Sequence, residues 1–93
     1  MGWKMNKYDT GKPRWTLLPI KQITQVIDVL EYGAKKYDVD GWKYVKDARV
    51  RYKNALARHV SSMLDGEWYD QESGLPHVAH AACNCLFLLW FGE

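Results

Sequence analysis

The sequence predicts an all-α fold, a three-helix bundle with an extended N-terminal arm. Two observations predict it: apolar residues recur at steps of three and four in three segments, and proline or glycine residues separate these segments. A chain of 93 residues leaves room for one small core, so we expect a single domain. We divide it into an arm over residues 1–18 and a helical core over residues 19–91.

The arm and the first helix are justified by periodicity and by one proline. Residues 1–18 show no sustained period and include a turn-forming stretch around Gly11 and Pro13. Pro19 then opens a helix over residues 19–37, because the N–H that proline lacks would have no partner in a first turn. The apolar stripe of this helix is Ile20, Ile23, Ile27, Leu30, Ala34 and Tyr37.

Two further helices follow a polar loop. The second is expected over residues 47–64, with Gly66 just past its end as a left-handed stop. The third, over residues 75–91, is apolar nearly all the way round, which predicts burial on several sides. Five Trp and six Tyr are more rings than so small a core can hide. We therefore expect a homo-oligomer that completes the bundle.

Composition and charge exclude several classes of protein. Thirteen Lys and Arg against eleven Asp and Glu give a net charge of +2, too little for a protein that tracks duplex nucleic acid. The longest apolar run, residues 85–91, is far shorter than the ~20 residues that span a bilayer. Cys83 and Cys85 are too close together to staple the fold and lack the second pair of a zinc site. We expect a soluble, cytoplasmic chain with reduced thiols and no membrane partner.

A polar stripe interrupts the apolar last helix. His77, His80 and Asn84 recur at steps of three and four, which places them on one face. An unpaired buried polar group costs a few kcal/mol, so these side chains need partners. Two interpretations remain open: hydrogen bonds to other helices within the core, or contacts to a ligand or metal.

Cations that suit phosphate gather at two places. Arg51 and Arg58 lie on one side of the second helix, with His59 adjacent, and two guanidinium groups suit a fork-like grip on phosphate. The alternative is that these arginines simply face solvent. In the arm, two cations and a ring occur together: Lys12, Arg14 and Trp15.

Carboxylates that could bind a metal are few. Glu31 precedes Lys35 by four residues, a spacing typical of a surface ion pair worth a few tenths of a kcal/mol. An acidic turn before the last helix contains Glu67, Asp70 and Glu72, which would be favourably placed at a helix N-terminus. These four carboxylates are weak candidates for metal ligands. No serine or cysteine stands in a context typical of a catalytic nucleophile, and the catalytic residues are left unassigned.

Short motifs along the chain carry a further signal. They are Lys7-Tyr8-Asp9, Gly11-Lys12-Pro13-Arg14, Leu18-Pro19, Gly33-Ala34-Lys35-Lys36-Tyr37, Trp42, Arg51-Tyr52, Arg58-His59, Gly66-Glu67 and the run from Glu72 to Asn84. Over residues 7–91 they resemble the phage-associated N-terminal domain of dATP/dGTP diphosphohydrolases. One departure is Gly41 before Trp42, where that domain usually has Asn. The resemblance implies an all-α relative of the MazG-like nucleotide pyrophosphohydrolases, a purine-nucleotide ligand, and the cytoplasm of a phage-infected bacterium.

The resemblance leaves two functions open. MazG-like enzymes hold Mg²⁺ with clustered carboxylates, whereas here Glu31 is followed by Lys35, and His77 and His80 take the place of the later acidic pair. Imidazole is a poor magnesium ligand and a good donor to phosphate. We therefore expect a nucleotide sponge that captures a purine nucleotide, such as a cyclic or signalling nucleotide of host anti-phage defence, without turnover or a required cofactor. The alternative is a dATP/dGTP diphosphohydrolase that depends on Mg²⁺ or Mn²⁺ and releases pyrophosphate.

Both functions use one set of ligand-binding residues. The predicted set is Lys12, Arg14, Trp15, Lys35, Trp42, Arg51, Arg58, His59, His77, His80 and Asn84. The basic side chains would neutralise phosphate, the tryptophans would stack on the base, and the last-helix residues would donate hydrogen bonds. In the enzymatic alternative the metal ligands would come from Glu31, Glu67, Asp70 and Glu72.

Overall fold

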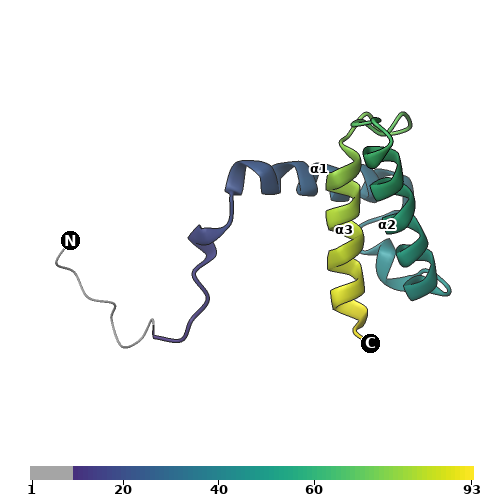
Figure 1. Ribbon diagram of the computed structural model, residues 1–93. Coiled ribbons are helices and arrows are strands. Elements are labelled where there is room, and N and C mark those ends of the chain that lie inside the picture. Colours follow the sequence, from purple (N-terminus) through teal and green to yellow (C-terminus); the bar gives the residue numbers. More distant parts are fainter. Residues whose placement is uncertain (1–9) are drawn as a thin grey trace.

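The computed structural model describes residues 10–93, which contain three α-helices, two short 3₁₀ helices and no strand (Figure 1). The α-helices are α1, Ile20–Tyr37; α2, Ala48–Leu64; and α3, His77–Phe91. Each predicted helix is therefore present, with its ends displaced by two residues at most. The all-α fold class is confirmed for the described part of the chain.

Local backbone chemistry fixes most of the helix ends. α1 begins directly after Pro19, whose carbonyl oxygen accepts hydrogen bonds from the N–H groups of Gln22 and Ile23. α2 ends at the predicted stop, where Gly66 has a φ of +98° and bonds back to the carbonyl of Met63. α3 starts two residues later than expected, because the Leu75 carbonyl accepts a hydrogen bond from Asp70 at 2.8 Å and is held in the preceding turn.

The loop between α1 and α2 is more ordered than the sequence suggests. It contains a 3₁₀ helix, η2, over Gly41–Tyr44. Within it, the Trp42 ring stacks on Phe87 of α3 with centroids 4.4 Å apart. The hydroxyl of Tyr52 donates to the Trp42 carbonyl oxygen at 2.6 Å. These contacts attach the loop to both α2 and α3, and they depend on residues distant in the sequence.

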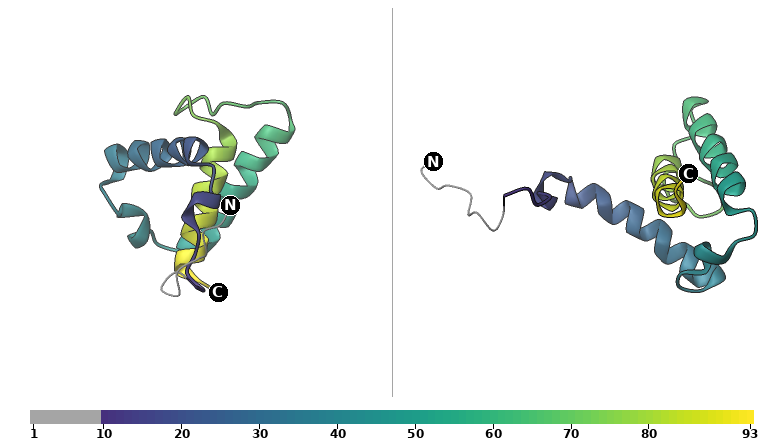
Figure 2. Two further views of the ribbon diagram at one scale, coloured as in Figure 1. Left: turned by 90° about the vertical axis from the view of Figure 1, so that its left-hand side faces the viewer. Right: turned by 90° about the horizontal axis from the view of Figure 1, so that it is seen from below.

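The three helices share a thin core. α2 and α3 run side by side, while α1 crosses α3 and makes little direct contact with α2 (Figures 1 and 2). Val29 of α1 and Ala79 and Cys83 of α3 are the buried centre. Partly buried side chains pack around them: Val26, Leu30, Leu75 and Phe87. Because α1 and α2 are held apart, the arrangement is more open than a closed three-helix bundle.

The first part of α1 and residues 10–19 before it project away from the other helices (Figure 2). Residues 10–19 are exposed and include one 3₁₀ turn, η1, Trp15–Leu17. The first nine residues of the expected arm, and the motif Lys7-Tyr8-Asp9, lie outside the described residues. The oligomer expected to complete the bundle stays a prediction.

Among the helices described, none combines the length and the apolar character needed to cross a membrane. The expected cytoplasmic setting stays a prediction.

Candidate functional site

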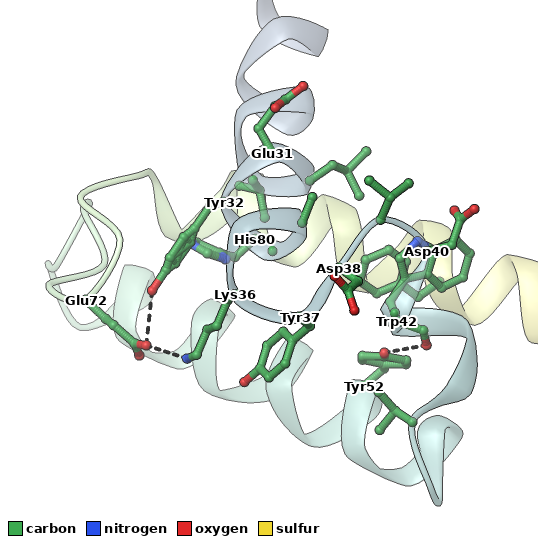
Figure 3. A pocket seen from close by; sticks show the side chains of 18 of the residues that line it. Glu31, Tyr32, Lys36, Tyr37, Asp38, Asp40, Trp42, Tyr52, Glu72 and His80 are labelled. Carbon is green, nitrogen blue, oxygen red and sulfur yellow. Dashed lines mark hydrogen bonds and ion pairs between the residues drawn. The ribbon is translucent and has the colours of Figure 1, made fainter.

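A pocket of about 700 Å³ lies between α1, η2, α2 and α3 (Figure 3). Its size falls in the range of small-molecule sites. Rings and aliphatic side chains form its apolar part, among them Val29, Trp42, Tyr52 and Phe87. Five carboxylates also line it: Glu31, Asp38, Asp40, Asp70 and Glu72. Of the described lining residues, only Lys36 carries a permanent positive charge, so the pocket is acidic.

Three histidines from α2 and α3 converge beside this pocket. The ring of His59 on α2 stacks on that of His80 on α3, with centroids 4.5 Å apart and planes inclined by 8°. The Nδ1 atom of His59 lies 2.8 Å from Nδ1 of His77. The step of three between His77 and His80 therefore places both on one face of α3, as predicted, and the contacts with His59 show that this face meets α2.

The hydrogen bonds of His77 assign its tautomer. Its Nε2 lies 2.6 Å from Oε1 of Glu67, and because a carboxylate only accepts, Nε2 carries the proton. A neutral His77 then has a lone pair on Nδ1, so His59 donates to it from its own Nδ1. This leaves Nε2 of His59 as an acceptor. His77 is 4% exposed, which makes such pairing obligatory.

The Ser73 hydroxyl assigns the tautomer of His80. It donates to Oδ2 of Asp70 at 2.8 Å and accepts the backbone N–H of Leu75 at 3.2 Å. Since its single proton is used, it accepts from Nε2–H of His80 at 2.7 Å. Nδ1 of a neutral His80 therefore has a lone pair.

Burial and hydrogen bonding set the charges at this cluster. Burial lowers the pKa of His59 to about 4, with further contributions from His80 and His77. Burial also lowers the pKa of His80, although Asp70 opposes the shift. Burial alone would raise the pKa of Asp70, but two hydrogen bonds from Ser73 bring it below its ordinary value. At neutral pH, His59 and His80 are therefore neutral and Asp70 is ionised.

A second network ties α1 to the turn between α2 and α3. Oε1 of Glu72 accepts hydrogen bonds from Nζ of Lys36 at 2.7 Å and from the hydroxyl of Tyr32 at 3.1 Å (Figure 3). The Lys36 bond, then the Tyr32 bond, lower the pKa of Glu72, and the Glu72 bond raises the pKa of Lys36. The charge of the pocket's lysine is thus already balanced by a neighbouring carboxylate.

The structure brings together only part of the predicted ligand-binding set. Three of its members line the pocket: Trp42, His59 and His80. Two more, His77 and Asn84, are buried on α3. His77 joins the histidine cluster, and Asn84 is 6% exposed. Six are exposed and do not line the pocket: Lys12, Arg14, Trp15, Lys35, Arg51 and Arg58.

Helix geometry explains why Arg51 and Arg58 lie outside the pocket. Tyr52 and His59 are seven residues apart and both line the pocket from α2. Arg51 and Arg58 each precede one of them by one residue, which rotates their side chains by about 100° around the helix. The imidazoles and guanidinium groups therefore do not converge on one cavity within a single chain. Nucleotide binding by the exposed cations stays a prediction.

The four weak candidates for metal ligands differ in their surroundings and in their hydrogen-bond partners. Glu31 lines the pocket, Glu72 is bound by Lys36, and Glu67 is bound by His77. Asp70 lies close to the histidines: one ligating atom each of His59, Asp70 and His77 lies within 4.8 Å of the other two. Two imidazoles and one carboxylate form a donor set that suits a transition metal.

Sequence reasoning missed several residues of the site, three of which take part in its hydrogen bonds. Tyr32 and Lys36 reach the pocket from α1, and Ser73 fixes Asp70 and His80. The steps of three and four from Val29 to Tyr32 and Lys36 place all three on one face, a signal that was present in the sequence. The spacing of Asp70 and Ser73 is likewise typical of a side-chain-stabilised turn.

Comparisons with known proteins agree with the motifs. The family model described as dATP/dGTP diphosphohydrolase, N-terminal, matches residues 4–93. A dATP/dGTP diphosphohydrolase of Salmonella phage PMBT28 is 34% identical over 84 residues, which cover 90% of this chain and 28% of that relative. The chain thus spans little more than a quarter of the relative's length. No solved structure matches it. On these matches, the chain belongs to the dATP/dGTP diphosphohydrolase N-terminal domain family.

Proposed function

We propose that this chain binds a purine deoxynucleoside triphosphate as its complex with a divalent cation, in the pocket between α1, η2, α2 and α3. The observation that carries the proposal is the charge of the lining, which has five carboxylates and one lysine. A free triphosphate would be repelled by this lining, whereas its Mg²⁺ or Mn²⁺ complex would find oxygen ligands there. The purine class comes from the family to which the chain belongs.

The apolar part of the pocket suits the base. Val29, Tyr52 and Phe87 offer a surface against which a purine can pack. Trp42 already stacks on Phe87 with one face, so only the rest of its ring is left for a base. With the base packed against these side chains, the triphosphate of the nucleotide would lie toward the carboxylates of the pocket. The proposal departs from the expectation that binding needs no cofactor.

Capture without turnover is the form of binding that the hydrogen bonds support best. Glu72 is engaged by Lys36 and Tyr32, and Glu67 by His77, so two carboxylates that could arrange metal and water are already committed. Sequestration of a signalling nucleotide of anti-phage defence would be one use of such capture. Hydrolysis to a monophosphate and pyrophosphate is the second candidate. It is favoured by the lone pair on Nε2 of the neutral His59, which could accept a proton from water.

Calorimetric titration with dATP, dGTP and dCTP tests the binding. We expect the purine nucleotides to bind more tightly than dCTP in Mg²⁺ or Mn²⁺, and about tenfold or more weakly when EDTA replaces the metal. Equal affinity with and without metal would contradict the proposal. Glu31→Gln, in the pocket, should weaken metal-dependent binding, whereas Asp28→Asn, exposed on the same helix outside the lining, should not. Arg58→Ala should also leave the affinity unchanged.

Chromatography of the nucleotide after incubation separates the two candidates. Intact dATP or dGTP recovered after heat release, at protein in excess of nucleotide, supports capture. Pyrophosphate formed in many-fold excess over the protein shows hydrolysis and rejects capture.

A further inference from the structure

We propose that His59, Asp70 and His77 form a binding site for a transition-metal dication such as Mn²⁺, Co²⁺ or Zn²⁺. Their ligating atoms lie within 4.8 Å of one another, and they come from α2, from the following turn and from α3. The ion bound here is a different ion from the cation that accompanies a nucleotide. Its binding does not require a nucleotide in the pocket, because three of its ligands are side chains of this chain and solvent can supply the rest.

The orientation of His77 is the first argument. Its Nε2–H donates to Glu67 at 2.6 Å, so the lone pair lies on Nδ1, the atom that faces His59. A carboxylate that holds the second nitrogen of a histidine is the usual partner of a metal-bound imidazole, because it fixes both tautomer and ring orientation. With an exposure of 4%, His77 is also held in place by the packing of α3.

The distance between the two imidazoles is the second argument. Their Nδ1 atoms are 2.8 Å apart. Two nitrogens bonded to one metal ion at about 2.1 Å, in tetrahedral or octahedral geometry, lie about 3.0–3.4 Å apart. Metal binding would therefore widen this separation by a few tenths of an ångström and turn the rings so that both lone pairs point at one ion beside the N···N line. His59 would present a lone pair in place of its Nδ1 proton, which its Nε2 can take.

The carboxylate completes a donor set with a clear chemical preference. Oδ2 of Asp70 is held by the backbone N–H of Ser73 at 2.9 Å and by its hydroxyl at 2.8 Å. Its side chain is 21% exposed, so solvent ligands can complete the coordination. Two imidazoles with one carboxylate favour Mn²⁺, Fe²⁺, Co²⁺ or Zn²⁺ over Mg²⁺ and Ca²⁺, which prefer all-oxygen ligands.

Titration of the nucleotide-free chain with Co²⁺ tests the site directly. We expect d–d absorption bands in the visible range that saturate at one ion per chain, are unaffected by excess Mg²⁺, and are removed by Zn²⁺ or EDTA. Absence of saturable bands, or their loss in excess Mg²⁺, would overturn the proposal. Because no nucleotide is present, the result is independent of the proposed function.

Variants assign the ligands. His59→Gln, Asp70→Asn and His77→Gln should each weaken Co²⁺ binding at least about tenfold, with the fold checked by circular dichroism. The matched control is Asp65→Asn, an exposed acid at the end of α2 outside the trio. It should keep affinity within about twofold of the unmodified chain. A similar loss in the control would overturn the assignment.

Glu67→Gln tests whether His77 acts as a metal ligand, because this substitution would not change metal affinity if His77 had only a structural role. Glu67 is exposed and does not belong to the trio, so its replacement should leave the fold intact. It should still lower metal affinity about 10–100-fold, the usual effect of changing the partner of a metal-bound histidine, because a neutral amide oxygen accepts the Nε2–H bond but does not raise the basicity of the ring as a carboxylate does. Unchanged affinity in Glu67→Gln would contradict the assignment of Glu67 as the partner of a metal-bound His77. Since His77 is buried, His59→Gln and Glu67→Gln keep the test decisive even where His77→Gln fails to fold.

Discussion

At the scale of single residues, Cys83 and Cys85 lie two positions apart on α3, which turns them by about 200° onto opposite sides of the helix and gives them different reactivity. Cys83 is 1% exposed and its thiol donates to the Val26 carbonyl at 3.3 Å, whereas Cys85 is exposed. Burial raises the pKa of the Cys83 thiol to about 12. Because the thiolate is the reactive form, we expect iodoacetamide at about pH 8 to alkylate Cys85 alone. Peptide mapping by mass spectrometry checks this, with the urea-unfolded chain, in which both thiols react, as the control.

His59 gives the fold a dependence on pH. Burial lowers its pKa to about 4, against about 6.5 in an unfolded chain, so the unfolded state binds the proton more tightly. The free energy of unfolding should therefore fall as pH drops from about 6.5 towards 4. Around His59, His80, His77 and Arg58 favour its neutral form, while Asp70 opposes them.

Urea unfolding in the presence of a chelator measures this effect. The midpoint should be lower at about pH 5 than at about pH 7. His59→Gln should reduce the difference, because its side chain has no titrating group. An equal pH dependence in the variant would assign the effect to other groups.

At this scale, part of the candidate site could be predicted from the sequence. The spacing of His77 and His80 locates a polar face by itself, because helix periodicity is local. The hydrogen-bond partners of these histidines could not be predicted, because Glu67 and Ser73 are brought to them by the conformation of the turn between α2 and α3. The face of α2 that meets α3 was also undecided from sequence, and this is why Arg58 was expected in the site in addition to His59.

At the scale of elements, one side chain joins the start of α2 to the end of α3. Nη2 and Nε of Arg49 donate to the carbonyl oxygens of Phe91 and Gly92 at 2.7 and 3.1 Å. The last carbonyls of a helix lack partners within it, and a cation is favourable there. We expect Arg49→Ala to lower the free energy of unfolding by about 1–2 kcal/mol.

The matched control for this change is Arg51→Ala. Arg51 is exposed on the same helix and its side chain makes no hydrogen bond in the described part of the chain, so its replacement should cost less than about 0.5 kcal/mol. Urea unfolding of both variants measures the difference. Equal effects would show that the bonds to α3 contribute no stability.

The helices themselves were predictable, and the pocket was not. Steps of three and four, with Pro19 and Gly66, mark α1 and α2 to within one residue. The 3₁₀ helix η2 was not predicted, because Trp42 is held there by stacking on Phe87. Phe87 is 45 positions further along the chain, so a local pattern cannot reveal this contact. The same contact forms one wall of the pocket.

At the scale of the whole molecule, large apolar side chains stay exposed on the described helices. Several of them on one face form an apolar patch of the kind that marks an interaction surface. On α3, Leu86, Leu89 and Trp90 lie on one face with exposures of 49, 78 and 56%, and Ile20 and Ile27 of the projecting α1 are also exposed.

We expect the chain to associate with itself through these faces. Burial of these apolar side chains at about 25 cal/mol per Å² would favour association. Light scattering after size exclusion should give a mass of at least twice 10.9 kDa. Leu89→Lys should shift the mass towards the monomer, because burial of the new charge is costly. Gln71→Lys, which adds the same charge on the exposed turn, should not. A mass of 10.9 kDa for the unmodified chain at high concentration would exclude self-association and leave the exposed face of α3 to a different partner.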